Sequence, residues 1–549
     1  MSRPVTTTGQ PIIVLKEGSE RTRGREAQTR NIQVAKLVAE IVRTSLGPRG
    51  MDKMLVDSFG DVTITNDGAT MLKEMDIEHP AGKMMVEIAK TVDTEVGDGT
   101  TSVVVLAGKL LELAEDLIRK GIHPTVIIDG YKQGAAKALE VLDSIKIDVK
   151  PEDTEPLKKV AATAMGSKLV AGDRGALADL AVEAVLAVKE TRDKTPTVDL
   201  DDIKVEKKPG GSISDTNIVK GIVLDKEVVH TGMPKRIKNA KIALVNRALE
   251  VQKTEFDARI NISSPEQMKL FMDEEKAMMK EMVDKIKASG ANVLISQKGI
   301  DDAVQHFLAK EGILAIRRAK KSDMEKLERA TGGRVVTNLE DLSEKDLGFA
   351  ALVEERKIED DKWVFIEGCR NPKSVTLLIR GGSERVVDEA ERSIHDALSV
   401  VKDVVLKPAI VAGGGAPEME AAFRVREWAT ELSGREQLAA IAFADALETI
   451  PLTLAENAGL DVVDIEVELR SDHRDGKKWF GVDVFNAKTA DMLKQDVIEP
   501  LSVKEQIINS ATEAATMILR IDDVVAASAM SAPPGGPEGM GGPPGGMEY

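Results

Sequence analysis

The stretch Val96-Gly97-Asp98-Gly99-Thr100-Thr101-Ser102 decides how the rest of the chain is interpreted. Two glycines flank an acid, and hydroxyl side chains follow before an apolar helical pattern begins at Val103. Glycine lets the backbone approach a ligand closely, and the free N–H groups at a helix start attract phosphate. The carboxylate of Asp98 could hold a hard cation together with phosphate oxygens. The stretch therefore predicts a magnesium–phosphate site, and the alternative is a turn in which Asp98 or Thr100 caps a helix.

Length and composition indicate a multidomain protein with an aliphatic core. The chain has 549 residues, enough for about three domains. Aromatic residues make up only 3% of a chain that is 42% hydrophobic, so Val, Ile, Leu, Ala and Met must fill the interior. The formal net charge of −17 argues against nucleic acid as the main partner, because phosphate backbones bind to basic surfaces.

Cysteine usage and hydropathy predict a cytoplasmic protein. Cys369 is the only cysteine, which excludes a disulfide within the chain and fits a reducing compartment. The N-terminus lacks the charged-then-apolar layout of a signal peptide, and no apolar run approaches the length of a membrane span. We therefore expect no membrane partner.

Hydrophobic periodicity predicts a mostly helical first part. Helical patterns cover about 24–46, 80–94 and the residues from just after Asp98 to about 120, and another helix opens at Pro124. The two short runs 54–56 and 62–65 predict a hairpin.

Beyond Pro151 the pattern changes. Residues 152–190 are helical and rich in alanine, whereas about 200–245 is strand-like. The polar segment 246–287 has an apolar side of Met268, Phe271, Met272, Met278, Met279 and Met282. Methionine suits adaptable contact surfaces, but the pattern alone favours an ordinary amphipathic helix with Met in the core.

The remaining segments alternate strands, helices and glycine loops. A strand–helix–strand rhythm over 293–316 predicts a small α/β domain. The strand at 375–379 precedes a long helix over about 383–402, and a second glycine loop, 411–416, precedes another. Helices are expected to dominate 417–460 and 502–525. Residues 531–549 are mostly Gly and Pro, so we expect a disordered tail there.

Five motifs taken together resemble the group II chaperonins of the thermosome type. They are Leu46–Met54, Asn66–Thr70, Val96–Ser102, Gly413–Ala416 and Leu454–Asp461, and a Gly-Gly-Met-like tail is also typical of that group. The likeness covers essentially the whole chain. It implies a multidomain α/β (α+β) fold with a mostly helical ATPase domain, a small hinge domain and an α/β domain that carries a helical protrusion.

The resemblance implies three domains, two of them discontinuous in sequence. They are an equatorial ATP-binding domain at 1–150 and 404–549, an intermediate hinge domain at 151–218 and 370–403, and an apical client-binding domain at 219–369 with a built-in lid at about 246–287. Two glycine loops more than 300 residues apart would then belong to one domain.

The same resemblance implies a site for ATP or ADP with Mg. Asp98 is expected to hold the metal. The expected nucleotide contacts are Leu46, Gly47, Pro48, Gly99, Thr100, Thr101, Ser102, Gly414 and Glu499. Glu499 matches an acid that binds ribose, although by itself it would be interpreted as a solvated surface acid.

The resemblance also supplies catalytic groups. Asp396 matches the carboxylate that orients or activates the attacking water, and Asp67 is expected to assist. Lys168, beside Ser167, is expected to sense the terminal phosphate, and the alternative is a surface lysine. Because Asp98 and Asp396 would belong to different domains, hydrolysis would be coupled to a conformational change.

The predicted function is an ATP-driven folding chaperone. The resemblance implies a double ring of like subunits, with an ATPase that drives enclosure of unfolded client proteins. The alternative is a passive ring scaffold that binds nucleotide only for assembly, and ATP turnover linked to ring closure separates the two. A small-molecule kinase is disfavoured, since the chain lacks the P-loop lysine motif.

Overall fold

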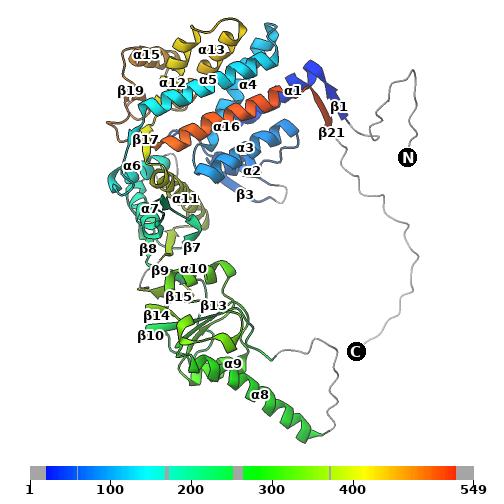
Figure 1. Cartoon of the computed structure of the whole chain (residues 1–549), viewed down its shortest axis with the longest axis vertical. Helices are drawn as coiled ribbons and strands as arrows, with labels where there is room; N and C mark the ends of the chain where they lie inside the picture. Colours follow the sequence, from blue (N-terminus) through cyan, green and yellow to red (C-terminus); the bar gives the residue numbers. More distant parts are fainter. Residues whose placement is uncertain are drawn as a thin grey trace, which may run out of the picture.

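The computed structural model describes residues 20–57, 60–166, 172–193, 195–251, 264–369 and 373–526 (Figure 1). Its elements follow one long axis, with a helical body at one end, a middle layer, and a sheet body at the other end. The mixture of helices and several separate small sheets matches the predicted multidomain α/β fold class.

The helical body is assembled from both halves of the chain. The first half supplies α1 (Gly24–Arg43), α2 (Gly68–Glu74), α3 (Pro80–Val96), α4 (Thr100–Arg119) and α5 (Pro124–Ile145). The second half supplies α12 (Ala416–Ala429), α13 (Arg435–Leu447), α14 (Thr449–Asn457), α15 (Val462–Arg474) and α16 (Leu501–Leu519). The two halves interlock because α16 packs against α3, α4 and α5.

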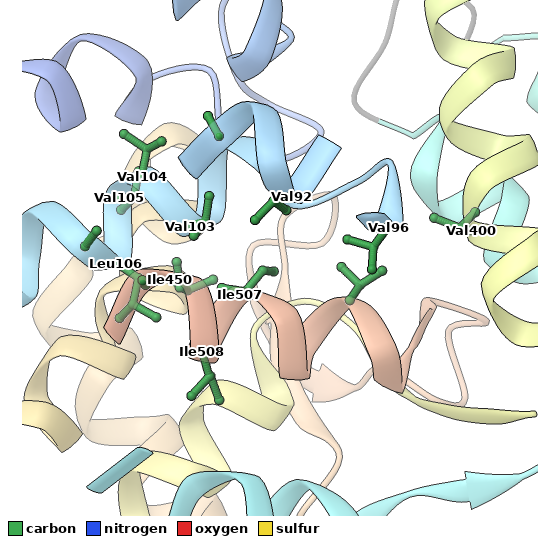
Figure 2. Close-up of a cluster of buried hydrophobic side chains, with 14 of the residues drawn as sticks. Val92, Val96, Val103, Val104, Val105, Leu106, Val400, Ile450, Ile507 and Ile508 are labelled. Atoms are coloured by element: carbon green, nitrogen blue, oxygen red, sulfur yellow. The ribbon is translucent and has the colours of Figure 1, made fainter. Parts of the chain in front are cut away.

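Helix α4 lies at the centre of this body. It is apolar on nearly every side, which requires packed neighbours all around it. Figure 2 shows Val103 and Leu106 of α4 on the side where Ile507 of α16 lies. Burying each of these side chains contributes about 1.5–3 kcal/mol.

The predicted helix starts at Pro80 and Pro124 are confirmed. Proline fits the first helical position because the N–H it lacks would have no intrahelical partner there. His79 and His123 cap the two helices by accepting hydrogen bonds from backbone N–H groups. Gly97, at φ +66°, ends α3 in a left-handed conformation that favours glycine.

Short strands join distant parts of the helical body. The predicted hairpin is confirmed as β2 (Lys53–Val56) and β3 (Val62–Thr65). The antiparallel pairs are β1 (Glu20–Arg23) with β21 (Asp523–Ala526), β17 (Ala409–Ala412) with β20 (Ile498–Pro500) and β4 (Ile147–Asp148), and β18 (Phe480–Asp483) with β19 (Lys488–Asp491). The helix predicted over 502–525 is therefore wrong at its end, where β21 pairs with β1.

The middle layer contains three helices and a small sheet. The helices are α6 (Thr154–Ala164), α7 (Arg174–Val188) and α11 (Glu384–Leu406), and the sheet has the order β7 (Ile203–Pro209), β16 (Val375–Gly381), β8 (Asn217–Val219). Two of the helices, α7 and α11, pack on that sheet. A hairpin of β5 (Glu190–Arg192) and β6 (Thr195–Thr197) lies beside them. Val400 of α11 joins the same hydrophobic cluster as Val96 of α3, so α11 links the middle layer to the helical body (Figure 2).

The sheet body is built from one continuous part of the chain. Its strands are β9 (Gly221–Leu224), β10 (Arg236–Val245), β11 (Val293–Ser296), β12 (Leu314–Ile316), β13 (Val335–Val336), β14 (Gly348–Ile358) and β15 (Asp361–Glu367), in the order β12-β11-β10-β14-β15-β9 with β13 also on β10. Its helices are α8 (Pro265–Ala288), α9 (Asp302–Lys310) and α10 (Lys321–Thr331). The strand–helix–strand prediction is confirmed, since β11 and β12 are parallel and α9 joins them.

Helix α8 extends from the far end of the sheet body (Figure 1). Its buried residues, Met279, Val283 and Ile286, all lie in its C-terminal half. The exposed large apolar side chains on α8 are Met268, Leu270, Phe271, Met272 and Met278. The interpretation of these methionines as core residues is thus confirmed for Met279 and wrong for Met268, Met272 and Met278. Residues 252–263 of the predicted lid and the tail at 531–549 lie outside the described residues.

One helical stretch within the described ranges, Arg435–Asn457, is long and apolar enough to cross a membrane. The expectation that no apolar run approaches that length is therefore wrong. The stretch comprises α13 and α14, and 72% of its most apolar window is buried inside this protein. A buried core helix passes the same test of length and composition, which makes a single stretch of this kind weak evidence for a membrane.

Candidate active site

A cavity of about 470 Å³ opens in the helical body next to α6 and α11. The predicted site residues that line it are Leu46, Gly47, Pro48, Asp67, Asp98, Gly99, Thr100, Thr101, Ser102, Asp396, Gly414 and Glu499. Ser167 and Lys168 lie outside the described residues. The fold thus brings residues from six separate parts of the sequence to one cavity.

The loop before α4 forms one wall of this cavity. Gly97 and Gly99 have φ angles of +66° and +83°, which glycine adopts without strain. One carboxylate oxygen of Asp98, Oδ1, accepts a hydrogen bond of 2.6 Å from the N–H of Gly99. The N-cap of α4 is Gly99, and no side chain caps the helix. The structure therefore does not show the alternative in which Asp98 or Thr100 caps α4.

Asp67 lies where the start of α2 meets the start of α4. Its Oδ2 accepts a hydrogen bond of 2.8 Å from the N–H of Thr70 and so caps α2. Its Oδ1 lies 3.5 Å from the Thr100 hydroxyl, which donates to it. A Cβ at Gly68 would come within 2.6 Å of the Thr101 hydroxyl, so only glycine permits this close approach.

Asn457 fixes the loop at 45–48. Its side-chain amide donates hydrogen bonds to the carbonyl oxygens of Arg43 and Leu46, at 3.0 and 2.8 Å. Gly47 has φ +82°, and a Cβ there would come within 2.3 Å of Leu454. Two residues of the motif at 454–461, Asn457 and Leu454, therefore hold the loop at 45–48 in place.

The second glycine loop and the hairpin of β18 and β19 form the opposite wall. The carbonyl oxygen of Gly414 accepts a hydrogen bond of 2.9 Å from the N–H of Val482. Asp483 accepts hydrogen bonds from the backbone and side chain of Asn486 at the tip of the hairpin. Burial acts to raise the pKa of Asp483, but these hydrogen bonds outweigh it and hold the pKa below its usual value.

Glu499 is not the solvated surface acid that its local sequence suggests. Its Oε2 lies 2.5 Å from the Nζ of Lys504, and the same Nζ lies 2.8 Å from Oε1 of Glu418. Burial raises the pKa of Glu499, and the positive charge of Lys504 acts against this rise. A buried ion cluster therefore lies in the cavity wall.

Helix α11 carries Asp396 to the cavity from the middle layer. Ser399, one turn further along α11, packs so tightly on Gly97 that a Cβ at residue 97 would come within 2.2 Å of the Ser399 Cβ. Another carboxyl on this helix, Asp403, is buried and accepts a hydrogen bond of 3.3 Å from Ser502. Burial raises the pKa of Asp403 to about 7, and the nearby charges of Asp98 and Glu95 add to the rise.

The oxygen groups at the cavity suit a hard cation that is bound together with phosphate. In the part of the chain that the structure describes, no three His, Cys, Asp or Glu side chains form a ready-made metal cluster. Asp98 supplies a carboxylate at the cavity, and Mg²⁺ commonly takes one or two protein carboxylates and completes its shell with phosphate and water oxygens. The donor set thus fits Mg²⁺ that arrives with a nucleotide.

Comparison with known proteins shows the family. The model of the TCP-1/cpn60 chaperonin family matches residues 38–529. The chain belongs to this family. It is 58% identical to thermosome subunit alpha of Archaeoglobus fulgidus over 537 residues, which cover 98% of each chain. It is also 58% identical to a thermosome subunit of Pyrococcus horikoshii, over 97% of each chain. A thermosome subunit of Methanopyrus kandleri is 58% identical over 95% of this chain and 96% of its own length.

Membership and this degree of identity establish the function at the level of the family. The protein is an ATP-dependent group II chaperonin with ATPase activity, as the sequence predicted. The chaperonin family uses nucleotide, acts on client proteins and forms oligomeric assemblies.

Sequence reasoning missed Lys504 and Glu418, and it assigned Asn457 no role beyond its place in the motif at 454–461. A signal for Lys504 exists, because residues 501, 504 and 508 share one face of α16 and the other two are Leu and Ile. Glu418 similarly begins a buried stripe that continues with Ala422 and Val425. A charged residue in a buried stripe is rare unless it is paired, so each of these positions predicts a partner.

Proposed function

We propose that the cavity binds Mg–ATP and hydrolyses it to ADP. The observation that carries this proposal is the convergence on one cavity of the glycine loops before α4 and α12, with Asp98, Asp396 and Glu499 around them. The backbone N–H groups at the start of α4 and the hydroxyls of Thr100, Thr101 and Ser102 would donate to phosphate oxygens.

In this proposal Asp98 holds Mg²⁺, and Gly414 and Glu499 lie on the ribose side of the nucleotide. Bound Mg²⁺ would neutralise the charge that develops on the phosphate oxygens. Leu46, Gly47 and Pro48 would flank the nucleotide on the side that Asn457 braces. Lys168, with Ser167, keeps its proposed role at the terminal phosphate.

We assign the chemical step to Asp396, with Asp67 assisting. The carboxylate of Asp396 would orient a water for attack on the terminal phosphorus and accept its proton as the bond to ADP breaks. Because Asp67 is fixed by capping α2, one of its oxygens stays directed to the region of Thr100. Two carboxylates held on separate elements suit the positioning of a water molecule.

We further propose that the helical body, the middle layer and the sheet body are the equatorial, intermediate and apical domains, with the ranges predicted above. In support, the core of the sheet body is a hydrophobic cluster distinct from the one that spans the other two. Movement of α11 would shift Asp396 relative to Asp98 and so couple hydrolysis to domain closure. The exposed apolar side of α8 supports a role as a lid over unfolded clients. The assembly would be a double ring in the cytoplasm.

The substitution Asp396→Ala tests this proposal. The variant is expected to bind ATP with near wild-type affinity by calorimetry, because Asp98 and the start of α4 remain. Single-turnover hydrolysis should fall by roughly 10²–10⁴, the usual loss for a general base. Asp388→Asn is the matched control, since Asp388 lies on the same helix but pairs with Lys207 and does not line the cavity. Wild-type hydrolysis in Asp396→Ala would remove Asp396 from the mechanism, and lost binding would make it a nucleotide contact.

A further inference from the structure

A buried lysine joins two carboxylates in the cavity wall. Lys504 is 5% exposed and Glu418 is 3% exposed, whereas the side chain of Glu499 is 20% exposed and lines the cavity. The lysine Nζ lies 2.8 Å from Glu418 and 2.5 Å from Glu499. Glu418 is not among the residues that line the cavity.

The position of Lys504 is unfavourable for the helix that carries it. It lies in the first turn of α16, where the unpaired N–H groups already present partial positive charge. Burying an ammonium group is costly even when it is paired. Helix stability therefore does not explain a lysine here, and its effect on the two carboxylates is the better explanation.

The backbone fixes the other side of Glu499. Strands β17 and β20 place Val411 opposite Glu499, and the chain then turns into the glycine loop. A Cβ at Gly413 would come within 2.7 Å of Oε1 of Glu499. One oxygen of this carboxylate thus lies against the glycine loop while the other meets Lys504.

We propose that Lys504 is a positioning residue that keeps Glu499 ionised and fixed as a hydrogen-bond acceptor, and thereby sets the preference for nucleotides with an intact ribose. Glu418 is the second counter-charge that retains Lys504 in the wall. This inference rests on the proposed binding of nucleotide in this cavity, with Glu499 on the ribose side.

The chemistry follows from what each protonation state can do. An ionised carboxylate only accepts hydrogen bonds, which suits the two hydroxyl donors of a ribose, whereas a neutral carboxyl group donates through one oxygen. Burial raises the pKa of Glu499, and the charge of Lys504 acts to lower it. The charges of Glu418 and Asp98 add to the rise. The two carboxylates in turn raise the pKa of Lys504, so the lysine stays charged.

The test compares the binding of ADP and 2′-deoxyADP, each with Mg²⁺, to the purified full-length protein by calorimetry between pH 6 and 9. The wild type should prefer ADP by a ratio that does not change with pH. The main variant is Lys504→Met combined with Glu418→Gln, which removes one positive and one negative charge and leaves the net charge of the cluster unchanged. Its preference for ADP should fall about tenfold at pH 6, the loss of one hydrogen bond to a charged group. The preference should return as the pH rises and Glu499 ionises.

Two further variants separate the possible failures. Lys407→Met is the matched control, because Lys407 pairs with Glu505 of α16 at the surface, away from the cavity, and its ratio should equal that of the wild type. Glu499→Gln should lose the preference for ADP at every pH. If Glu499→Gln keeps the wild-type ratio, the proposed role of Glu499 at the ribose is wrong. If Glu499→Gln loses the preference while the double variant keeps it at all pH values, Lys504 does not position Glu499.

Discussion

Two buried lysines, Lys504 in the cavity wall and Lys204 at the junction of the middle layer and the sheet body, use the same chemistry in different settings. Lys204 is 6% exposed, and its Nζ lies 2.8 Å from both Glu206 on its own strand and Asp323 on α10. It also donates to the carbonyl oxygen of Val223 on β9, at 2.7 Å. All partners of Lys504 belong to the helical body, whereas Lys204 joins two bodies.

This difference separates two uses of a buried charge. In the helical body the partners of Lys504 are already fixed by packing, so its charge acts on the ionisation of a cavity residue. At the junction Asp202, just before β7, also pairs with Arg329 of α10 at 2.6 Å, so two buried carboxylates, Asp202 and Asp323, have their partners on the opposite body. Any rotation of the sheet body away from the middle layer must break buried ion pairs, which is strongly unfavourable. The cluster around Lys504 thus acts on the ionisation of Glu499, whereas the cluster around Lys204 resists rotation of the sheet body relative to the middle layer.

The largest effect is expected from Asp98→Ala, which changes the cavity and leaves both lysine clusters intact. Hydrolysis that depends on Mg²⁺ should fall below detection, because the cation loses its proposed protein carboxylate. Assembly should persist, and electron micrographs of the purified variant should still show rings. Normal turnover would show that the metal is held elsewhere.

Deletion of residues from about 255 to 280 is expected to preserve ATP hydrolysis and to abolish enclosure of the client. This change removes the exposed apolar part of α8 and touches neither lysine cluster. The ATPase rate should stay within about twofold of the wild type, since surface changes away from a site have small effects. Protection of a trapped client from protease should be lost. Retained protection would mean that another segment closes the chamber.

Breaking the junction cluster by Lys204→Met should destabilise the fold by about 3–5 kcal/mol, since Asp323 and Glu206 would remain buried without their cation. The melting temperature should fall, and nucleotide affinity should not change. Lys208→Met is the matched control: Lys208 lies on the same strand and pairs with Asp361, but this carboxylate is 60% exposed, so a loss below about 1 kcal/mol is expected. Equal losses in the two variants would contradict the distinction between buried and exposed pairs.

The smallest effect concerns pH. Burial raises the pKa of Asp202 to about 6, although the charge of Arg329 acts in the opposite direction. Because the pKa is raised in the folded state, proton binding favours folding at low pH, and this contribution is lost as the pH rises from about 4 to about 6. The melting temperature of Asp202→Asn should therefore rise relative to that of the wild type over this range. A difference between the two that is independent of pH would show that Asp202 keeps an ordinary pKa.

Local signals explain why much of the fold could be predicted. Helix starts at Pro80 and Pro124 depend on the residue itself and its neighbours, so the sequence displays them directly. The stretch 96–102 indicates a magnesium–phosphate site by itself, but the other residues at the cavity could be predicted only through resemblance, because loops that are far apart in sequence form it.

What could not be predicted depends on partners that are distant in sequence. The partners of Lys504 and the Asp323 partner of Lys204 lie on other elements, and no local pattern names them. The end of α16 was misplaced for the same reason, since β21 exists only through pairing with β1 near the other end of the chain. The exposure of Met268 and Met272 also depends on which elements surround α8, which periodicity does not show.

Strand β21, which pairs with β1, is synthesised long after it, so the helical body can be completed only late in translation. The sheet body comes from one continuous segment, so its core can close while translation is still under way. The first five helices emerge earlier but must wait for α16, which packs on four of them, α1, α3, α4 and α5. At roughly 5–20 residues per second, that interval lasts on the order of tens of seconds. During that time the apolar face of α4 that α16 covers lacks this neighbour. The incomplete chaperonin chain therefore exposes apolar surface of the kind that chaperones bind.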